Sequence, residues 1–233
     1  MRKAERMLLE LPQVIAGFEE APEIRQVLVL GGRAPEPSWL QRIVFNRVVY
    51  AADRGAEACK AAGILPIQVL GDFDSINEDA KAWLDAHSIE LERYPADKDE
   101  TDFQLCLSRV HGDLLVTGCW GGRFDHAFSN IFSALWGRKT GANVRVFADE
   151  TEALFLLFDG ESLELDFKTR PLAISLLPLG SRCNNVDIRG VKWELCGAEL
   201  LQAYPCAVSN VPENGRVFVN VGEGVLGVYC YWE

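Results

Sequence analysis

The sequence predicts an α/β domain followed by an all-β domain. Up to about residue 149, short apolar runs alternate with helical patterns, whereas strand patterns separated by turns dominate after residue 150. Hydrophobic residues make up 48% of the 233-residue chain, so it can bury a sizeable core and does not resemble a disordered protein. We therefore expect one domain over residues 1–149 and a second over residues 150–233.

The α/β half begins with a compact apolar run, 27–30, which Gly31-Gly32 ends. Strands that alternate with helices imply a mainly parallel sheet with helices on both faces and ligands at the carboxyl ends of the strands. The expected strands are 27–30, 47–51, 67–70, 89–92, 113–117 and 144–148, and the expected helices begin at 38 or cover 56–62, 78–87, about 102–110 and 127–136.

The β half reads as strands separated by turn sequences such as Asp159-Gly160 and Asn214-Gly215. Few helical signals occur there, so we expect antiparallel strands in a sandwich or barrel-like domain. The expected strands are 153–158, 162–167, 173–177, 216–221 and 227–232.

The amino terminus has some features of a signal peptide, because Arg2, Lys3 and Arg6 precede an apolar stretch. Glu10 and Pro12 interrupt that stretch, and no small-residue cleavage site follows. We expect an amphipathic helix or a loose leader here, and no other stretch has the length of a membrane span.

The net charge of −11 argues against a nucleic-acid-binding or anionic membrane-binding surface, because both need clustered basic residues. An anionic substrate would need a metal or a few placed basic residues. The seven cysteines are odd in number and form no Cys-x-x-Cys pair, which predicts buried free thiols in a reducing cytosol. Three histidines make a histidine-based metal site improbable.

Two acidic runs carry the strongest chemical signal. Asp72 and Asp74 follow the strand at 67–70 and would share one side of an extended chain, and Asp99 and Asp102 share one face of a helix start. If the runs converge, a divalent cation relieves their repulsion, and oxygen ligands of this kind suit Mg²⁺ completed by substrate phosphates. The alternative is that these residues form solvated turns and helix caps.

Two glycine-containing loops also follow strands. Gly55, two residues after Asp53, would let the backbone approach a phosphate closely, although a plain helix cap explains this turn equally well. In the segment 118–126, three glycines precede Arg123, whose guanidinium can bind phosphate oxygens at a helix entrance. Asp125 either orients Arg123 or caps the helix.

In the β half, Trp193 and the pair Ser209-Asn210 stand out. An aromatic face suits a flat, cationic heterocycle, both by stacking and by attraction to the ring quadrupole. The structural alternatives are a core tryptophan and an ordinary turn.

The motifs GDFDS, DKDETD, GCWGGRFDH and GVKW, with the later Ser-Asn, occur in the order found in the thiamine pyrophosphokinase family, which the chain resembles. The resemblance implies transfer of a pyrophosphoryl group from ATP to the hydroxyl of thiamine, giving thiamine diphosphate and AMP. It also implies a cytoplasmic homodimer that uses Mg²⁺, with the thiamine site shared between subunits and its aromatic residue contributed by the opposite subunit.

The resemblance assigns roles to individual residues. Asp72, Asp74 and Asp102 correspond to Mg²⁺ ligands, and with Asp99 and Arg123 they form the catalytic group. The ATP and phosphate site would comprise Asp53, Gly55, Lys98, Thr101, Arg123 and Asp125, and the thiamine site Trp193, Ser209 and Asn210. The chain departs from the family at Arg54, where a glycine is common, which puts close backbone approach at this turn in doubt.

Two other functions remain open at this point. An Asp-x-Asp motif can serve a hydrolase that forms a phosphoaspartate, but such an enzyme would carry it after its first strand, and here it follows about the third. A non-catalytic sensor of thiamine or nucleotide would not need the full carboxylate set.

Overall fold

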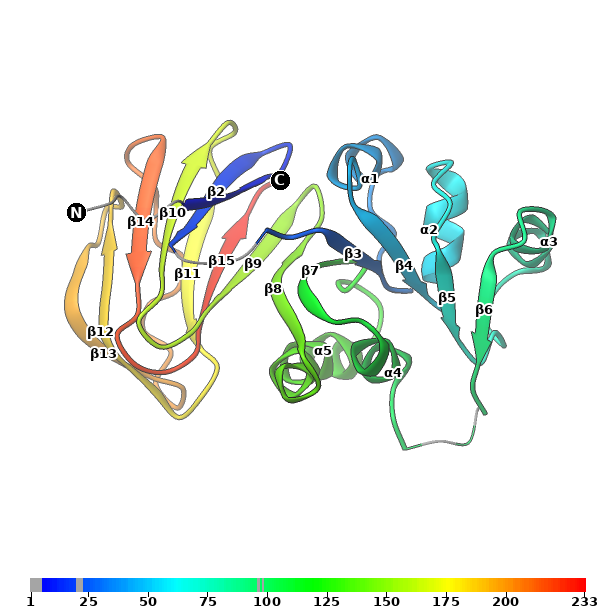
Figure 1. The fold of residues 1–233 in the computed structure, drawn as a ribbon. Coiled ribbons are helices and arrows are strands. Elements are labelled where there is room, and N and C mark those ends of the chain that lie inside the picture. The colour runs from blue at the N-terminus through cyan, green and yellow to red at the C-terminus, as the bar shows by residue number, and fades with distance from the viewer. Residues whose placement is uncertain (1–5, 20–22, 96, 98) are drawn as a thin grey trace. The chain divides into compact units, whose positions relative to one another are not determined.

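The structure is a computed structural model that describes residues 6–19, 23–95, 97 and 99–233. The chain forms two compact units (Figure 1). The α/β unit comprises Ile24–Asp149, and the β unit comprises Glu150–Glu233 together with the amino-terminal segment.

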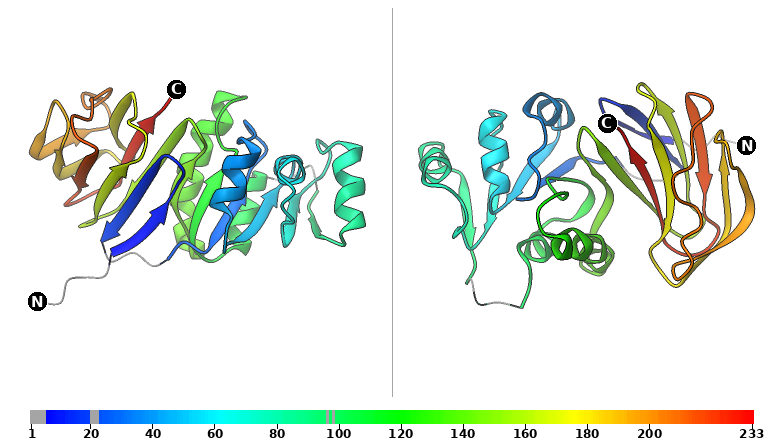
Figure 2. Two further views of the ribbon diagram at one scale, coloured as in Figure 1. Left: turned by 90° about the horizontal axis from the view of Figure 1, so that it is seen from above. Right: turned by 180° about the vertical axis from the view of Figure 1, so that it is seen from behind.

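The α/β unit contains a parallel sheet with the strand order β8-β7-β3-β4-β5-β6. Helices α1 and α2 lie on one face of this sheet, and α4 and α5 lie on the other (Figures 1 and 2). The predicted α/β fold with helices on both faces is therefore confirmed. The strands are β3 (Gln26–Val29), β4 (Val48–Ala52), β5 (Gln68–Gly71), β6 (Glu90–Arg93), β7 (Gly112–Thr117) and β8 (Ala142–Ala148), and the helices are α1 (Pro37–Ile43), α2 (Gly55–Ala61), α3 (Glu78–Ala86), α4 (Asp102–Arg109), α5 (Phe124–Gly137) and the short η1 (Arg138–Thr140).

Local sequence fixes where the helices begin. The Asn77 side chain accepts a hydrogen bond from Ala80 N at 2.8 Å, which caps α3. Thr101 and Gln104 form a reciprocal capping box at the start of α4, with distances of 3.3 Å and 2.9 Å. Because α4 begins directly after Thr101, Asp102 lies in its first turn.

Glycines let the carboxyl-end loops of neighbouring strands approach one another. A Cβ atom on Gly55 would lie 2.0 Å from the carbonyl oxygen of Val29, and one on Gly118 would lie 2.2 Å from that of Leu30. Only a residue without a side chain fits at such positions. The loops after β3, β4 and β7 are therefore in direct contact.

The strand pairs of the β unit are antiparallel, and they form one sheet in the order β1-β2-β10-β14-β12-β13 and a group in the order β11-β15-β9. Phe18 and Phe155 pack between the two at a ring distance of 6.3 Å, so the predicted all-β sandwich is confirmed. The strands are β1 (Arg6–Glu10), β2 (Val14–Glu19), β9 (Glu152–Leu157), β10 (Ser162–Phe167), β11 (Ala173–Pro178), β12 (Arg182–Arg189), β13 (Leu195–Leu201), β14 (Arg216–Asn220) and β15 (Leu226–Tyr231).

The expected amphipathic helix or loose leader at the amino terminus is wrong. β1 and β2 form a hairpin, closed by a 2.9 Å hydrogen bond from Leu11 N to Val14 O, and β2 pairs with β10. Val14, Ala16 and Phe18 alternate along β2 and are buried. The structure groups this hairpin with the β unit, whereas the sequence interpretation placed residues 1–149 in one domain.

Besides β1 and β2, the strands β12 and β13 were absent from the sequence interpretation. Their ladder is irregular, with register shifts on either side of Val186. Asn185 has a left-handed φ of 52°, and Gly197 has a φ of 60°. Bulges of this kind disturb the alternation of buried and exposed residues by which a strand is recognised.

We expect Gly55→Ala to destabilise the protein by about 1–3 kcal/mol or more, because the new methyl group meets backbone that has no space to move. Urea unfolding measures this free energy. Gly180→Ala is the matched control, because no atom lies within 4 Å of its added Cβ. Equal stability of the two variants would contradict the close packing of these loops.

Candidate active site

Three aspartates meet at the carboxyl edge of the parallel sheet. Asp53 follows β4, and Asp72 and Asp74 follow β5, the neighbouring strand. One carboxylate oxygen from each lies within 4.8 Å of the other two. The arrangement brings together two residues expected as metal ligands and one expected at the nucleotide site.

The turn after β5 is not the extended chain that the spacing suggested. Phe73 has a left-handed φ of 63°, its side chain is buried, and the guanidinium carbon of Arg93 lies 5.4 Å from its ring centroid. Asp74 N donates a 3.1 Å hydrogen bond to Asp72 Oδ1. A buried aromatic anchor in a strained turn thus brings the two carboxylates together.

The Asp53 turn is fixed against the same strand. Asp53 N donates to Leu70 O at 2.8 Å, and Asp53 itself has a left-handed φ of 43°. Arg54, in contrast, has ordinary helical angles of −56° and −12°. This turn therefore does not need a glycine at position 54.

Asp53 is partly buried beside other negative charges. Burial raises the pKa of Asp53, the negative charges of Asp102 and Asp72 raise it further, and a hydrogen bond from the Ser75 hydroxyl opposes them. Oδ1 of Asp53 is buried and has no hydrogen-bond partner among the described residues. A bound cation would satisfy this oxygen, so the residues present fit a divalent metal.

The second acidic run is only partly described. Asp99 is exposed, Asp102 is half-buried in the first turn of α4, and Lys98 lies outside the described residues. Thr101, expected at the nucleotide site, uses its hydroxyl to accept the capping hydrogen bond from Gln104 N. Asp102 is not one of the three clustered aspartates, although its negative charge adds to the effect of burial in raising the pKa of Asp53.

Arg123 and Asp125 form an ion pair at the start of α5. Arg123 Nε and Nη2 donate to the two carboxylate oxygens of Asp125 at 3.1 Å and 2.5 Å, and Asp125 Oδ1 also accepts from His126 N at 3.0 Å. The Arg123 guanidinium lowers the pKa of Asp125. Both side chains are exposed, so Asp125 orients an arginine that a ligand can reach.

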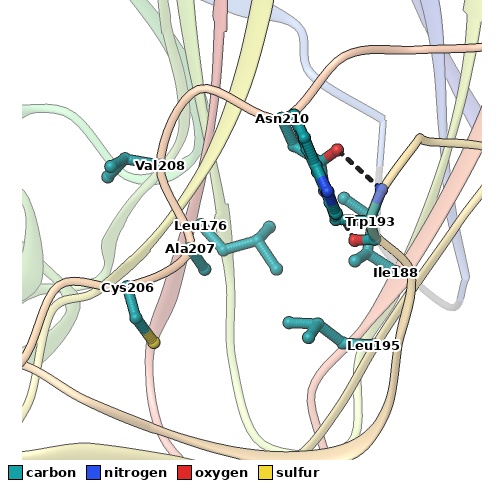
Figure 3. Close-up of a pocket in the computed structure, with 8 residues that line it drawn as sticks. All are labelled: Leu176, Ile188, Trp193, Leu195, Cys206, Ala207, Val208 and Asn210. Carbon is teal, nitrogen blue, oxygen red and sulfur yellow. Dashed lines mark hydrogen bonds between the residues drawn. The ribbon is translucent and has the colours of Figure 1, made fainter.

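In the β unit, eight residues line a cavity of about 440 Å³ (Figure 3). It contains Trp193 and Asn210, two of the expected thiamine residues. Asn210 accepts from Trp193 N at 3.1 Å and donates to Trp193 O at 2.7 Å. Ser209 is not among the lining residues, and its backbone N–H donates to Ser175 Oγ at 3.0 Å.

The sequence interpretation missed the other lining residues of this cavity, which are Leu176, Ile188, Leu195, Cys206, Ala207 and Val208. They come from β11, β12, β13 and the loop that follows, and no local motif marks them. The prediction that the cysteines are buried is also wrong for Cys196 and Cys206, which are exposed. Cys206 is exposed because it lies in the loop that borders the cavity.

An ion pair between Arg33 and Asp149, which the sequence interpretation did not include, lies at the same edge of the sheet. Arg33 follows Gly31-Gly32 in the loop after β3, and Asp149 follows β8. A repeat in the sequence could have drawn attention to Arg33, because the tripeptide Gly-Gly-Arg occurs at 31–33 and again at 121–123.

An acidic cluster with an accessible arginine on an α/β unit, joined in one chain to a β unit with an apolar cavity, is the arrangement expected of an enzyme that transfers a phosphate group to a small molecule. Residues 41–146 match the family model "Thiamin pyrophosphokinase, catalytic domain", and residues 163–226 match "Thiamin pyrophosphokinase, vitamin B1 binding domain". The chain belongs to the thiamin pyrophosphokinase family, whose members are kinases that produce thiamine diphosphate.

Named relatives agree with this assignment. The chain is 29% identical over 179 residues to the thiamine pyrophosphokinase of Bacillus subtilis, a match that covers 75% of this chain and 82% of the relative. It is 24% identical to thiamine pyrophosphokinase 2 of Oryza sativa, covering 70% of this chain and 64% of that protein.

Solved structures share the fold. A thiamine pyrophosphokinase from Bacillus subtilis superposes with a TM-score of 0.77 at 22% identity, covering 89% of this chain and 99% of that one. The thiamin pyrophosphokinase from Candida albicans gives 0.74 at 16% identity, covering 89% of both chains.

We expect Asp53→Asn to stabilise the metal-free protein at neutral pH. The folded-state pKa of Asp53 is raised, so the wild type loses stability as the pH rises from the unfolded pKa through the folded one, and the uncharged variant avoids this loss. Urea unfolding across a pH series, with exposed Asp85→Asn as the control, measures the difference. The difference in unfolding free energy between Asp53→Asn and the wild type should shrink as the pH falls towards the ordinary aspartate pKa. If Asp53→Asn were less stable than the wild type at neutral pH, burial would not raise the pKa of Asp53.

Proposed function

We propose that the chain transfers the pyrophosphoryl group of ATP to the hydroxyl of thiamine at the carboxyl edge of the α/β sheet. The observation that carries this proposal is the convergence of Asp53, Asp72 and Asp74, with one buried oxygen left without a hydrogen-bond partner among the described residues. In the reaction, the thiamine oxygen forms a bond to the β-phosphorus of ATP. The bond from that phosphorus to the oxygen shared with the α-phosphorus breaks, and AMP leaves with that oxygen.

We assign Asp72, Asp74 and Asp102 as the ligands of Mg²⁺, with Asp53 as a further acidic neighbour. Carboxylates of this kind hold Mg²⁺ together with waters and substrate phosphates. When bound, the ion supplies positive charge to the phosphate oxygens of ATP. The protein residues contribute by holding that charge at a fixed place beside the sheet edge.

The phosphate site is formed by the remaining expected residues. Arg123, oriented by Asp125, binds phosphate oxygens, and the backbone at Gly55 approaches them closely. Lys98 and Thr101 complete the expected set. Asp72 or Asp99 is the candidate to accept the proton of the thiamine hydroxyl.

The cavity of the β unit is the proposed thiamine site. Its lining is mainly apolar, and the exposed ring of Trp193 offers a face for a flat, cationic ring. Asn210 holds the backbone of Trp193 through two hydrogen bonds. Ser209, next to Asn210, is the third expected residue of this site.

We propose that the protein is a homodimer in the cytoplasm, with the thiamine site shared between subunits. An aromatic row on α5 supports self-association, because Phe124, Phe128 and Trp136 are 80%, 54% and 39% exposed and lie on one helix face with Phe132. The segment 126–137 carries no acidic residue in a chain of net charge −11, which lowers repulsion between two copies. Within the described residues, no helix is long and apolar enough to cross a membrane.

The two alternative functions predict other products. A phosphohydrolase would release phosphate without thiamine, and a sensor would bind its ligands without turnover. Incubation with ATP, Mg²⁺ and thiamine, followed by chromatography for AMP and thiamine diphosphate, distinguishes the three.

We expect Asp74→Asn and Asp102→Asn each to lower turnover by about 100-fold or more, because each removes a negative ligand while keeping the side-chain size. Thiamine-dependent AMP formation measures turnover, and circular dichroism checks the fold. Asp85→Asn, an exposed site on α3, is the control and should retain activity. Near-normal turnover in either ligand variant would remove it from the metal site.

We expect thiamine to protect Cys206 from a thiol reagent and to leave Cys196 unprotected. Both thiols are exposed, but only Cys206 lines the cavity. Peptide mass spectrometry should show labelling of Cys206 slowed by roughly tenfold at saturating thiamine. Equal labelling of Cys206 with and without thiamine would place the thiamine site elsewhere.

A further inference from the structure

Two loops that each contain the tripeptide Gly-Gly-Arg leave neighbouring strands at the same edge of the sheet. Gly31-Gly32-Arg33 lies after β3, and Gly121-Gly122-Arg123 lies after β7. β3 and β7 are adjacent and parallel, so both loops emerge at their carboxyl ends. Arg33 and Arg123 therefore follow adjacent strands at the same edge of the sheet.

Backbone contacts join the two loops. Gly32 N donates to Gly118 O at 2.8 Å, and Arg33 N donates to Trp120 O at 2.5 Å. On the other side, a Cβ on Gly31 would lie 2.9 Å from the Cβ of Arg54, the residue that follows Asp53. The Arg33 loop is thus located between the Asp53 turn and the glycine-rich loop of Arg123.

A buried carboxylate holds the guanidinium of Arg33. Nε and Nη2 of Arg33 donate to Asp149 Oδ2 at 3.0 Å and 2.5 Å. The side chain of Asp149 is 1% exposed and that of Arg33 is 40% exposed. Two hydrogen bonds to one buried oxygen hold the planar guanidinium in one orientation, and part of the side chain is exposed to solvent.

If Arg33 served only to neutralise the buried charge of Asp149, its side chain would not need to be exposed to solvent. In the same unit, Arg145 and Asp113 form an ion pair at 4.0 Å in which both side chains are only 4% exposed. That pair lies within β7 and β8, where no ligand is expected, and it is closed to solvent. The Arg33 pair differs because its arginine reaches solvent at the edge that carries the acidic cluster.

We propose that Arg33 is a second arginine that binds the phosphate chain of ATP, with Asp149 as its positioning residue. This inference rests on the proposed function, in which the negatively charged phosphate chain of ATP binds at the carboxyl edge of the parallel sheet, beside the clustered aspartates. Arg33 and Arg123, on adjacent loops, bind phosphate oxygens from neighbouring positions. Preorganisation by Asp149 reduces the conformational entropy that Arg33 loses on binding.

The test measures the dissociation constant of MgATP by calorimetry. Arg33→Met keeps the aliphatic stem, and the double variant Arg33→Met/Asp149→Asn also removes the carboxylate that would be left buried without its partner. We expect both to weaken MgATP binding by about tenfold or more, with Arg33→Lys intermediate and the KM for thiamine within about twofold of the wild type. Arg216→Ala, which breaks an exposed pair with Asp166 in the β unit, is the control and should bind MgATP normally.

Urea unfolding of the same variants separates binding from folding. If Arg33 only stabilises the loop, the variants lose stability but bind MgATP within about twofold of the wild type, and the proposal is overturned. If the wild type makes AMP from ATP and thiamine but Arg33→Met binds MgATP normally, the proposed function stands and only the role of Arg33 is rejected. A wild type that forms no AMP rejects the proposed function, and a wild type that does not bind MgATP overturns the role of Arg33.

Discussion

The main constraint on the α/β unit is that three aspartates, Asp53, Asp72 and Asp74, lie close together at the carboxyl edge of its parallel sheet. Three carboxylate oxygens lie within 4.8 Å of one another, a separation at which each pair of unit charges repels by roughly 1–4 kcal/mol, depending on the local dielectric. Burial is the main cause of the raised pKa of Asp53, and the negative charges of Asp102 and Asp72 add to it. The hydrogen-bonded strands β4 and β5 and the buried Phe73 keep the turns in place against this repulsion.

Close contact between loops is how the sheet maintains this arrangement. Gly55 and Gly118 bring the loops after β4 and β7 against the end of β3, and Gly71 lies against Asp53. Left-handed angles at Asp53 and Phe73 add local backbone strain beside the carboxylates. A site built in this way is rigid, because moving one loop would displace its neighbours.

Sequence patterns predicted much of the fold but only part of the site. Alternating apolar runs identified the strands of the α/β unit, and the position of Asp72 and Asp74 after a strand indicated the correct edge. The geometry was wrong in detail, because the left-handed turn at Phe73 depends on its burial in the tertiary structure. The hairpin β1–β2, the bulged strands β12 and β13, and the apolar lining of the cavity rest on contacts between distant segments, which no local pattern contains.

The proposed thiamine site in the β unit offers a cationic ligand an aromatic ring. Asn210 hydrogen bonds to both backbone groups of Trp193 and so fixes the position of this segment without using its indole ring. The ring remains 55% exposed, and Lys192 Nζ lies 4.5 Å from its centroid. That contact is a cation–π interaction, the kind of attraction that the ring face offers a cationic ligand. A cationic ring of larger flat area would gain stacking in addition to this attraction, whereas a neutral ring would gain stacking alone, so the ring face favours a charged heterocycle.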